Sequence, residues 1–314
     1  MRTSILRFLA ASVVTGCFAL PFACSTTSKS SASIAGQVVD LQGAPIANVR
    51  VSGGGGSATT GADGRFSFGA AEGKIVVAFV AQGYVRSHKS IVVSGDGPAR
   101  VFAVLPKQGD PQPLDATAGG TVTGPRGSVL TAPAGAFVDR ETGAAVSGMI
   151  TVALTPLDPS VAAELRAFPG KLVGKHASGA IAQLVSYSVV DVEAEQNGRR
   201  LTVKPGMQLS LTMPGRASGG NPQSTWLWSL DETDALWKEE GTATLDVGKG
   251  TYAALLPHLC PYNVDGDAVP GCVKGRVVDC SGTPVYGLNV LGYTRQTSSL
   301  DETDRYGRFS IPGE

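Results

Sequence analysis

The chain is poor in the residues and motifs from which most catalytic centres are built. Its 314 residues include only three histidines and five cysteines. It contains no Gly-x-Ser-x-Gly, His-Glu-x-x-His or Gly-x-x-x-x-Gly-Lys-Ser/Thr segment. These absences exclude the nucleophile elbow, the commonest zinc-peptidase motif and the phosphate loop. We therefore predict a protein that is not an enzyme, with no catalytic residue, no resident metal and no cofactor.

An excess of charge of either sign is also missing. The 26 basic residues equal the 26 acidic ones, so no basic field exists to attract nucleic acid, and we predict no nucleic-acid partner. After residue 24 no apolar run is long enough to span a bilayer. The 41 glycines and 19 prolines, with charged residues at 17%, are typical of turn-rich β structure.

What the chain does contain is one segment in two copies. Residues 34–46 read Ile-Ala-Gly-Gln-Val-Val-Asp-Leu-Gln-Gly-Ala-Pro-Ile, and residues 273–285 read Val-Lys-Gly-Arg-Val-Val-Asp-Cys-Ser-Gly-Thr-Pro-Val. A Gly-Arg-Phe-Ser element follows each copy, at residues 64–67 and 307–310. Self-similarity of this kind predicts one structural unit used twice.

The first copy has the pattern of a small β-sandwich. Asp40 and Gly43 predict a turn, and Pro45 restarts an extended segment. The apolar run 75–80 predicts a central strand, and shorter runs bring the total to six or seven strands, which suits a single sandwich. Four glycines at 53–56 predict a hairpin tip and not a phosphate loop, because no Lys-Ser/Thr pair follows them.

These residues resemble a known family. Gly-x-Val-x-Asp-x-x-Gly-x-Pro-Ile, then Gly-Arg-Phe-Ser and an aliphatic strand ending in Gly-Tyr, is similar to the carboxypeptidase regulatory-like domain, over residues 33–106 and again over 272–314. The resemblance implies a transthyretin-like sandwich that serves as an accessory module. The second copy stops at Glu314, before its later strands, so we expect it to be incomplete and the chain to be part of a longer protein.

Between the two copies the sequence predicts a linker at 107–117 and a larger β-sandwich at 118–262. Asp158 and Pro159 predict the start of a short helix over 160–167. The Gly-Gly-x-Val entry and the Pro-x-Gly-Ala-Phe corner of this region resemble the ZU5-like region. The overall prediction is an all-β chain of tandem β-sandwich domains: a transthyretin-like first module, this middle sandwich and a truncated second transthyretin-like module.

Two features of the middle region leave alternatives open. Trp226 and Trp228 lie two residues apart, so they share a strand face as either a stacking platform for sugar rings or part of the core. Residues 263–267, Asn-Val-Asp-Gly-Asp, are either a linker between domains or a fragment of a calcium loop.

The N-terminus carries an export signal. Arg2 and Arg7 precede an apolar stretch over residues 8–23, which predicts a leader at 1–24. Cys24 follows it directly, and a Ser/Thr-rich segment at 25–32 reads as a flexible tether. This arrangement resembles a bacterial lipoprotein with its lipid on Cys24. Cys17 is the alternative site, and secretion without a lipid is a third outcome.

Three further cysteines, Cys260, Cys272 and Cys280, agree with an oxidising compartment. Cys272 and Cys280 flank a predicted strand that would hold them more than about 20 Å apart, so they cannot pair with each other. We expect a Cys260–Cys272 disulfide. A zinc site that adds His258 to the three cysteines is the alternative, although no Cys-x-x-Cys spacing supports it.

The function predicted from these features is a structural spacer, adhesion or binding module of the bacterial cell envelope. Its partners would be the outer membrane, through the lipid, and a glycan or surface protein. A carbohydrate-binding protein is one alternative. An accessory region of a larger exported hydrolase is the other.

Overall fold

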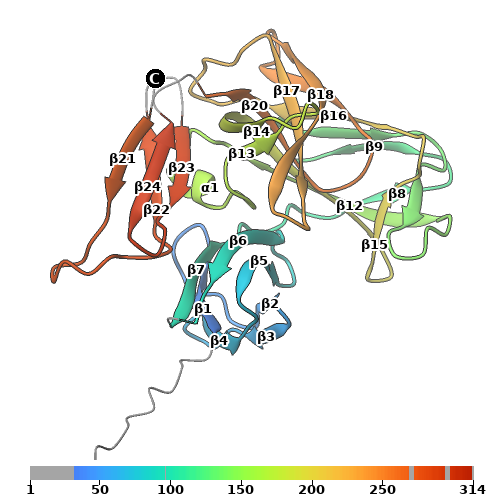
Figure 1. The fold of residues 1–314 in the computed structure, drawn as a ribbon. Helices are drawn as coiled ribbons and strands as arrows, with labels where there is room; N and C mark the ends of the chain where they lie inside the picture. Colours follow the sequence, from blue (N-terminus) through green and yellow to red (C-terminus); the bar gives the residue numbers. More distant parts are fainter. Residues whose placement is uncertain (1–31, 96, 269–271, 294–297, 313–314) are drawn as a thin grey trace, which may run out of the picture.

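The computed structural model of the chain describes residues 32–95, 97–268, 272–293 and 298–312 (Figure 1). Nearly all of the regular structure is strand, so the predicted all-β class with tandem sandwiches is confirmed. The predicted leader, nearly all of the tether and both candidate lipidation residues, Cys17 and Cys24, lie outside the described residues. Within the described ranges no helix is long and apolar enough to cross a membrane.

The first module is a sandwich of two sheets. One sheet has the order β4-β1-β7 and the other β3-β2-β5-β6, and β1 runs antiparallel to β4 but parallel to β7. Alternate residues of these strands face a shared apolar core that includes Ile34, Val77 and Phe79. The strands are β1 (Ser33–Val39), β2 (Arg50–Gly53), β3 (Gly56–Thr59), β4 (Arg65–Gly69), β5 (Gly73–Val80), β6 (Ser87–Val93) and β7 (Pro98–Val104).

The C-terminal module contains the same turn as the first module, with equivalent backbone hydrogen bonds. The Asp40 N–H donates to the Ala44 carbonyl over 2.9 Å, and the Asp279 N–H donates to the Thr283 carbonyl over the same distance. Gly43 and Gly282 both have a φ of 85°, a left-handed conformation that favours glycine. The turn predicted from the repeated segment is therefore present in both copies. The strands of this module are β21 (Cys272–Arg276), β22 (Asn289–Tyr293), β23 (Ser298–Glu302) and β24 (Arg308–Pro312).

A close approach explains the glycine that begins each copy. Gly36 pairs with Phe66 across β1 and β4, and Gly275 pairs with Phe309 across β21 and β24. A Cβ on Gly36 would lie 1.8 Å from the Val101 carbonyl oxygen, and one on Gly275 would lie 2.4 Å from the Phe309 ring. Only glycine fits at position 36, because the clash there is with backbone, whereas a side chain at position 275 would require the Phe309 ring to shift.

The middle domain is one hydrogen-bonded sheet that curls around its own core. Its main path is β11-β15-β14-β20-β17-β18-β19-β16-β10-β9, with β8, β12 and β13 attached beside it. The long strand β14 pairs with β15 and β20 along this path and also with β12 and β13 beside it. The core includes Phe137, Tyr252 and Tyr262. The strands are β8 (Gln112–Asp115), β9 (Gly120–Thr123), β10 (Val129–Ala132), β11 (Phe137–Asp139), β12 (Met149–Leu157), β13 (Val173–Lys175), β14 (Ile181–Gln196), β15 (Arg199–Val203), β16 (Leu209–Pro214), β17 (Ser224–Asp231), β18 (Leu236–Asp246), β19 (Thr251–Leu256) and β20 (Pro261–Asp267).

Two boundaries differ from the prediction. The predicted linker at 107–117 contains strand β8, which pairs with β12. Residues 263–267 are neither a linker nor a calcium loop, because they belong to β20, which pairs with β14 on one side and β17 on the other. The middle domain thus extends past residue 262. The prediction assumed that polar residues of this kind are exposed, but Asn263 and Asp265 are fully buried within the sheet.

The predicted helix is present but shorter. Helix α1 (Ala162–Arg166) begins after Val161, which gives no side-chain cap. Asp158 instead accepts hydrogen bonds from the backbone N–H and hydroxyl of Ser160, over 2.8 and 2.6 Å. A single 3-10 turn at Pro125–Gly127 is the other helical element among the described residues.

Candidate functional site: the junction between the modules

The most distinctive site lies where the modules meet. A buried apolar cluster, here called the junction core, joins Val39 and Val104 of the first module to Phe168, Trp228 and Trp237 of the middle domain. Burial of this kind is the main favourable term in association, so the two units are held together by a shared interior. The remaining buried members are Leu157, Leu165, Ala167, Leu172, Leu184, Val189 and Leu230, and Leu41, Phe102, Ala182 and Leu291 pack against them.

Strand β6 anchors the first module to the segment after α1. The His88 backbone N–H donates to the Pro169 carbonyl over 3.0 Å. The Lys89 ammonium, although buried, donates to the Phe168 carbonyl over 2.7 Å. Burying an ammonium is costly unless it is hydrogen-bonded, so this contact depends on the two modules staying docked.

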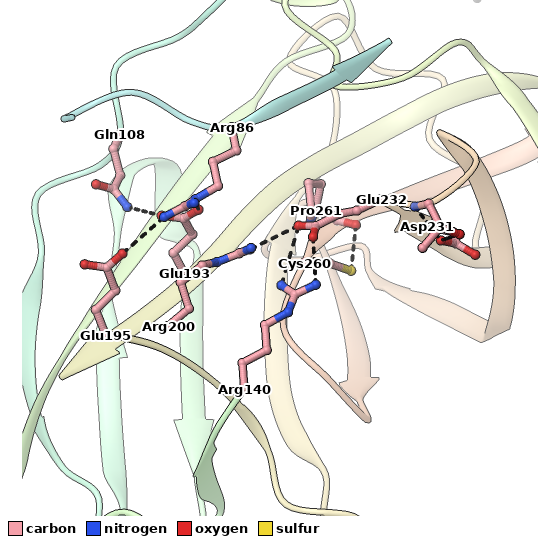
Figure 2. Close-up of polar contacts among 11 residues, drawn as sticks. Arg86, Gln108, Arg140, Glu193, Glu195, Arg200, Asp231, Glu232, Cys260 and Pro261 are labelled. Atoms are coloured by element: carbon pink, nitrogen blue, oxygen red, sulfur yellow. Dashed lines mark hydrogen bonds and ion pairs between the residues drawn. The ribbon is translucent and has the colours of Figure 1, made fainter. Parts of the chain in front are cut away.

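Beside the junction core lies an ionic cluster, whose side chains Figure 2 shows converging from both modules. Arg86, just before β6, lies 3.0 Å from Glu193 and 3.5 Å from Glu195, both on β14. The Gln108 amide donates to the other oxygen of Glu193 over 2.7 Å. Glu193 is 8% exposed, so its charge is balanced by groups of the first module rather than by water.

Two more arginines complete the ionic cluster (Figure 2). Arg140 lies 2.7 Å from Glu232 and Arg200 lies 3.1 Å from it. Burial opposes ionisation of Glu232, but the Arg200 hydrogen bond and the charges of both arginines hold its pKa below the ordinary value. The turn at residues 231–234 thus folds back toward β15 and the end of β11, where the two arginines lie.

Two neutralised groups lie at the same place. Burial, and then the charge of Glu193, raise the pKa of Asp191 well above its ordinary value, and its Oδ2 atom has no hydrogen-bond partner among the described residues. Burial lowers the pKa of His88. Both groups are therefore favoured in their uncharged forms, as buried groups are when pairing is incomplete.

The structure separates the two tryptophans that the sequence proposed as a ligand platform. Trp228 is 0% exposed and belongs to the junction core, whereas Trp226 is 37% exposed. The His176 ring meets both in edge-on contacts, with centroid distances of 5.7 Å to Trp226 and 4.8 Å to Trp228. A platform of two rings is therefore not formed, and the core alternative holds for Trp228.

His176 is a polar feature that the sequence did not reveal. Its Nδ1 atom lies 2.8 Å from Glu239 on β18, and its Nε2 atom lies 3.1 Å from Asp267 at the end of β20. The Glu239 hydrogen bond is the largest of the effects that raise the pKa of His176. These residues are far apart in the sequence, and only the pairing of β13 with β18 and of β14 with β20 brings them together.

The predicted Cys260–Cys272 disulfide is wrong. Cys260 carries a free, buried thiol whose Sγ atom donates to the Pro261 carbonyl over 3.2 Å, and burial raises the pKa of this thiol well above its ordinary value. Its side chain lies in the core of the middle domain. Cys280 is free and exposed. The Cys272 side chain lies outside the described residues.

The zinc alternative also lacks support in the part of the chain that the structure describes. There, no group of three or more His, Cys, Asp or Glu residues is placed to hold a metal ion. His258, the proposed fourth ligand, instead lies 2.9 Å from Glu240.

Comparisons with known proteins identify one module. No curated protein matches the chain. The similar solved structures include BcpA, the major pilin subunit of Bacillus cereus. The match spans 88% of this chain and 84% of the pilin chain at 10% identity, with a TM-score of 0.19. A variant of the same pilin covers 89% and 84%, also at 10% identity, with a TM-score of 0.23. The family model of the carboxypeptidase regulatory-like domain matches residues 33–106. Over these residues the first module is therefore similar to a carboxypeptidase regulatory-like domain, as the sequence predicted.

Proposed function

We propose that this chain is a non-enzymatic spacer of the bacterial cell envelope that holds a surface or partner at a fixed distance. The observation that carries the proposal is the junction itself, where the first module and the middle domain share both a buried apolar core and the ionic cluster. Neighbouring domains in one chain usually meet through smaller and more polar contacts and move relative to each other. A shared core removes that freedom.

Rigidity is what a spacer needs. The junction core contains two tryptophans and Phe168, each with no exposed surface. Each large side chain of this kind contributes about 2–3 kcal/mol through burial. Separating the modules would take Val39 and Val104 out of this cluster and leave Glu193 without its arginine. The docked arrangement is thus favoured over an open one, and the distance across the two modules stays fixed.

The proposed location is the outer membrane, reached through a lipid on Cys24, with Cys17 as the alternative residue and secretion as the remaining case. The leader at 1–24 and the polar segment at 25–32 support this part of the proposal. A flexible tether between the lipid and a rigid pair of modules would let the spacer stand away from the bilayer.

The anchor is tested by producing the full chain in a Gram-negative host and separating membrane from soluble fractions. We expect the wild type in the membrane fraction, with an acylated N-terminal cysteine by mass spectrometry. Cys24→Ser should move it to the soluble fraction, and Cys17→Ser should not. A mature protein with a free amine and no acyl chain would remove the anchor and leave secretion.

The two alternative functions, carbohydrate binding and an accessory role beside a hydrolase, are tested by different observations. A carbohydrate-binding function now depends on Trp226 alone, since Trp228 is buried. Loss of glycan binding on Trp226→Ala would favour that function over a spacer. An accessory role beside a hydrolase would be favoured by a catalytic domain encoded next to this chain.

A further inference from the structure

A cavity of about 460 Å³ opens where all three modules come together. One wall is the outer face of the β4-β1-β7 sheet, which contributes Ala35, Arg100 and Phe102. The facing wall is residues 285–288 of the C-terminal module, and the end of α1 closes one side. Figure 1 shows the C-terminal module beside α1, next to the first module.

The lining has two chemical parts. Most of it is apolar, with Phe102, Val285 and Leu288 among the contributors. Among the described residues its charged side chains are all arginines, Arg65, Arg100 and Arg166, and none is a carboxylate. An apolar body with one convergent charge type is the usual composition of a small-molecule site, and the volume falls in the usual range of about 300–1,000 Å³.

Arg100 and Arg166 are the two arginines available for a ligand. Arg65 lies 3.7 Å from Asp63, an exposed and weak pairing. Arg100 and Arg166 make no ion pair with any residue that the structure describes. A guanidinium without a protein partner presents two parallel N–H donors that match a carboxylate.

The positive character extends beyond the cavity. A neighbouring hollow of about 910 Å³ shares Arg100 and adds Lys74, Lys171 and Arg305. Its one acidic residue, Asp304, already accepts hydrogen bonds from the backbone N–H groups of Tyr306 and Arg308. Clustered cations of this kind raise the local concentration of anions and increase their rate of arrival.

We propose that the cavity binds a small organic anion, a carboxylate with an aliphatic or aromatic body. The carboxylate would lie at the rim between Arg100 and Arg166, and the body would cover Phe102 and Leu288. This is a binding function separate from the spacer role. Because the walls come from different modules, the ligand would also stabilise their arrangement.

The test is isothermal titration of the full chain with decanoate and with 1-naphthoate, and 1-naphthamide serves as the uncharged control. We expect both carboxylates to bind at one site and the amide to bind at least about tenfold more weakly, since it loses the charge-assisted contacts. Binding of the carboxylates should weaken as salt rises from low to physiological concentration.

Variants locate the site. Arg100→Gln and Arg166→Gln should each weaken carboxylate binding by about fivefold, the effect of losing a partly exposed ion pair. Arg50→Gln changes an exposed arginine of the same module that does not line the cavity, and it should leave affinity unchanged. Leu288→Glu places a negative charge in the apolar wall and should abolish binding while the protein stays folded, because Leu288 is already 44% exposed.

Three results would overturn the proposal. One is equal binding of the amide and the carboxylates, which would show that the guanidinium groups do not contribute. Another is an equal effect of Arg50→Gln and Arg100→Gln. The third is absence of heat for either carboxylate up to its solubility limit. Each leaves the spacer role intact, since none of these variants touches the junction core.

Discussion

Arg86→Ala removes the ion pair between the first module and Glu193 of the middle domain. The substitution leaves Glu193 on β14, 8% exposed, with only the Gln108 amide as a partner from the first module. Glu195 loses its 3.5 Å contact with the same guanidinium. The change therefore acts on the docking of the modules and not on the core of either one.

The expected cost follows from burial. Removing one partner of a fully buried ion pair costs about 3–5 kcal/mol, because a charge is left buried and uncompensated. The Arg86 side chain is 27% exposed, and Gln108 still solvates Glu193 in part, so solvent screening reduces the cost. We expect the free energy of unfolding to fall by about 2 kcal/mol.

Arg65→Ala is the matched control. Arg65 belongs to the same module and also faces an acidic residue, Asp63, but the two side chains are 72% and 65% exposed. Exposed pairs contribute between zero and about 1 kcal/mol. We expect this variant to differ from the wild type by less than about 0.5 kcal/mol.

The assay is urea unfolding followed by tryptophan fluorescence. All three tryptophans lie in the middle domain, so their fluorescence reports on a module that does not contain Arg86. If the modules unfold together, Arg86→Ala lowers the fluorescence midpoint, and circular dichroism shows the same midpoint. An unchanged fluorescence midpoint, with only the dichroism shifted, would refute the reasoning, because it would show that the first module unfolds alone.

Three further predictions concern single positions. Gly36→Ala should destabilise the first module by about 3 kcal/mol in urea unfolding followed by dichroism, since its Cβ would meet a backbone oxygen, whereas Gly69→Ala, with open space around it, should be neutral. Because the folded state raises the pKa of His176 above 6.5, the stability that its protonated form provides is complete below that pH and is lost as pH rises through the raised pKa. The difference in melting temperature between wild type and His176→Gln should therefore shrink from pH 5.5 to pH 8.5, and a constant difference would contradict this assignment. N-ethylmaleimide should label Cys280 but not Cys260 in the native protein by peptide mapping, since one thiol is exposed and the other buried with a raised pKa.

The local features of the modules could be predicted from sequence because their causes are local. A turn that needs an Asp side chain, a left-handed glycine and a proline within six residues leaves its signature in those residues, at Asp40 and again at Asp279. The central strand at 75–80 was likewise visible as an apolar run, and it forms most of β5.

The junction could not be predicted, because its causes are spread along the chain. Val39 and Val104 look like ordinary strand residues of a sandwich, yet they point outward and are covered by Phe168 and Trp228. Glu193 has the alternation of a solvated strand face. Its partner Arg86 lies 107 residues earlier, and nothing in either segment indicates the other.

The same limit explains the two wrong boundaries and the missing disulfide. Asn263 and Asp265 have the composition of a turn, but hydrogen bonding inside the sheet allows them to be buried in β20. The sequence favours a Cys260–Cys272 pair because Cys272 and Cys280 cannot reach each other, whereas the Cys260 side chain lies in the middle core, directly before β20. Side-chain direction at the end of a strand depends on pairing that sequence spacing does not show.

The most direct test of the docked arrangement is a distance measurement between the two modules by pulsed electron paramagnetic resonance. Spin labels on Glu72→Cys, exposed between β4 and β5 of the first module, and on Val247→Cys, 68% exposed in the middle domain, would report it after the native cysteines are replaced. A shared junction core predicts one narrow distance distribution that broadens in Arg86→Ala. A broad or multi-peaked distribution in the otherwise unmodified protein would contradict a rigid spacer.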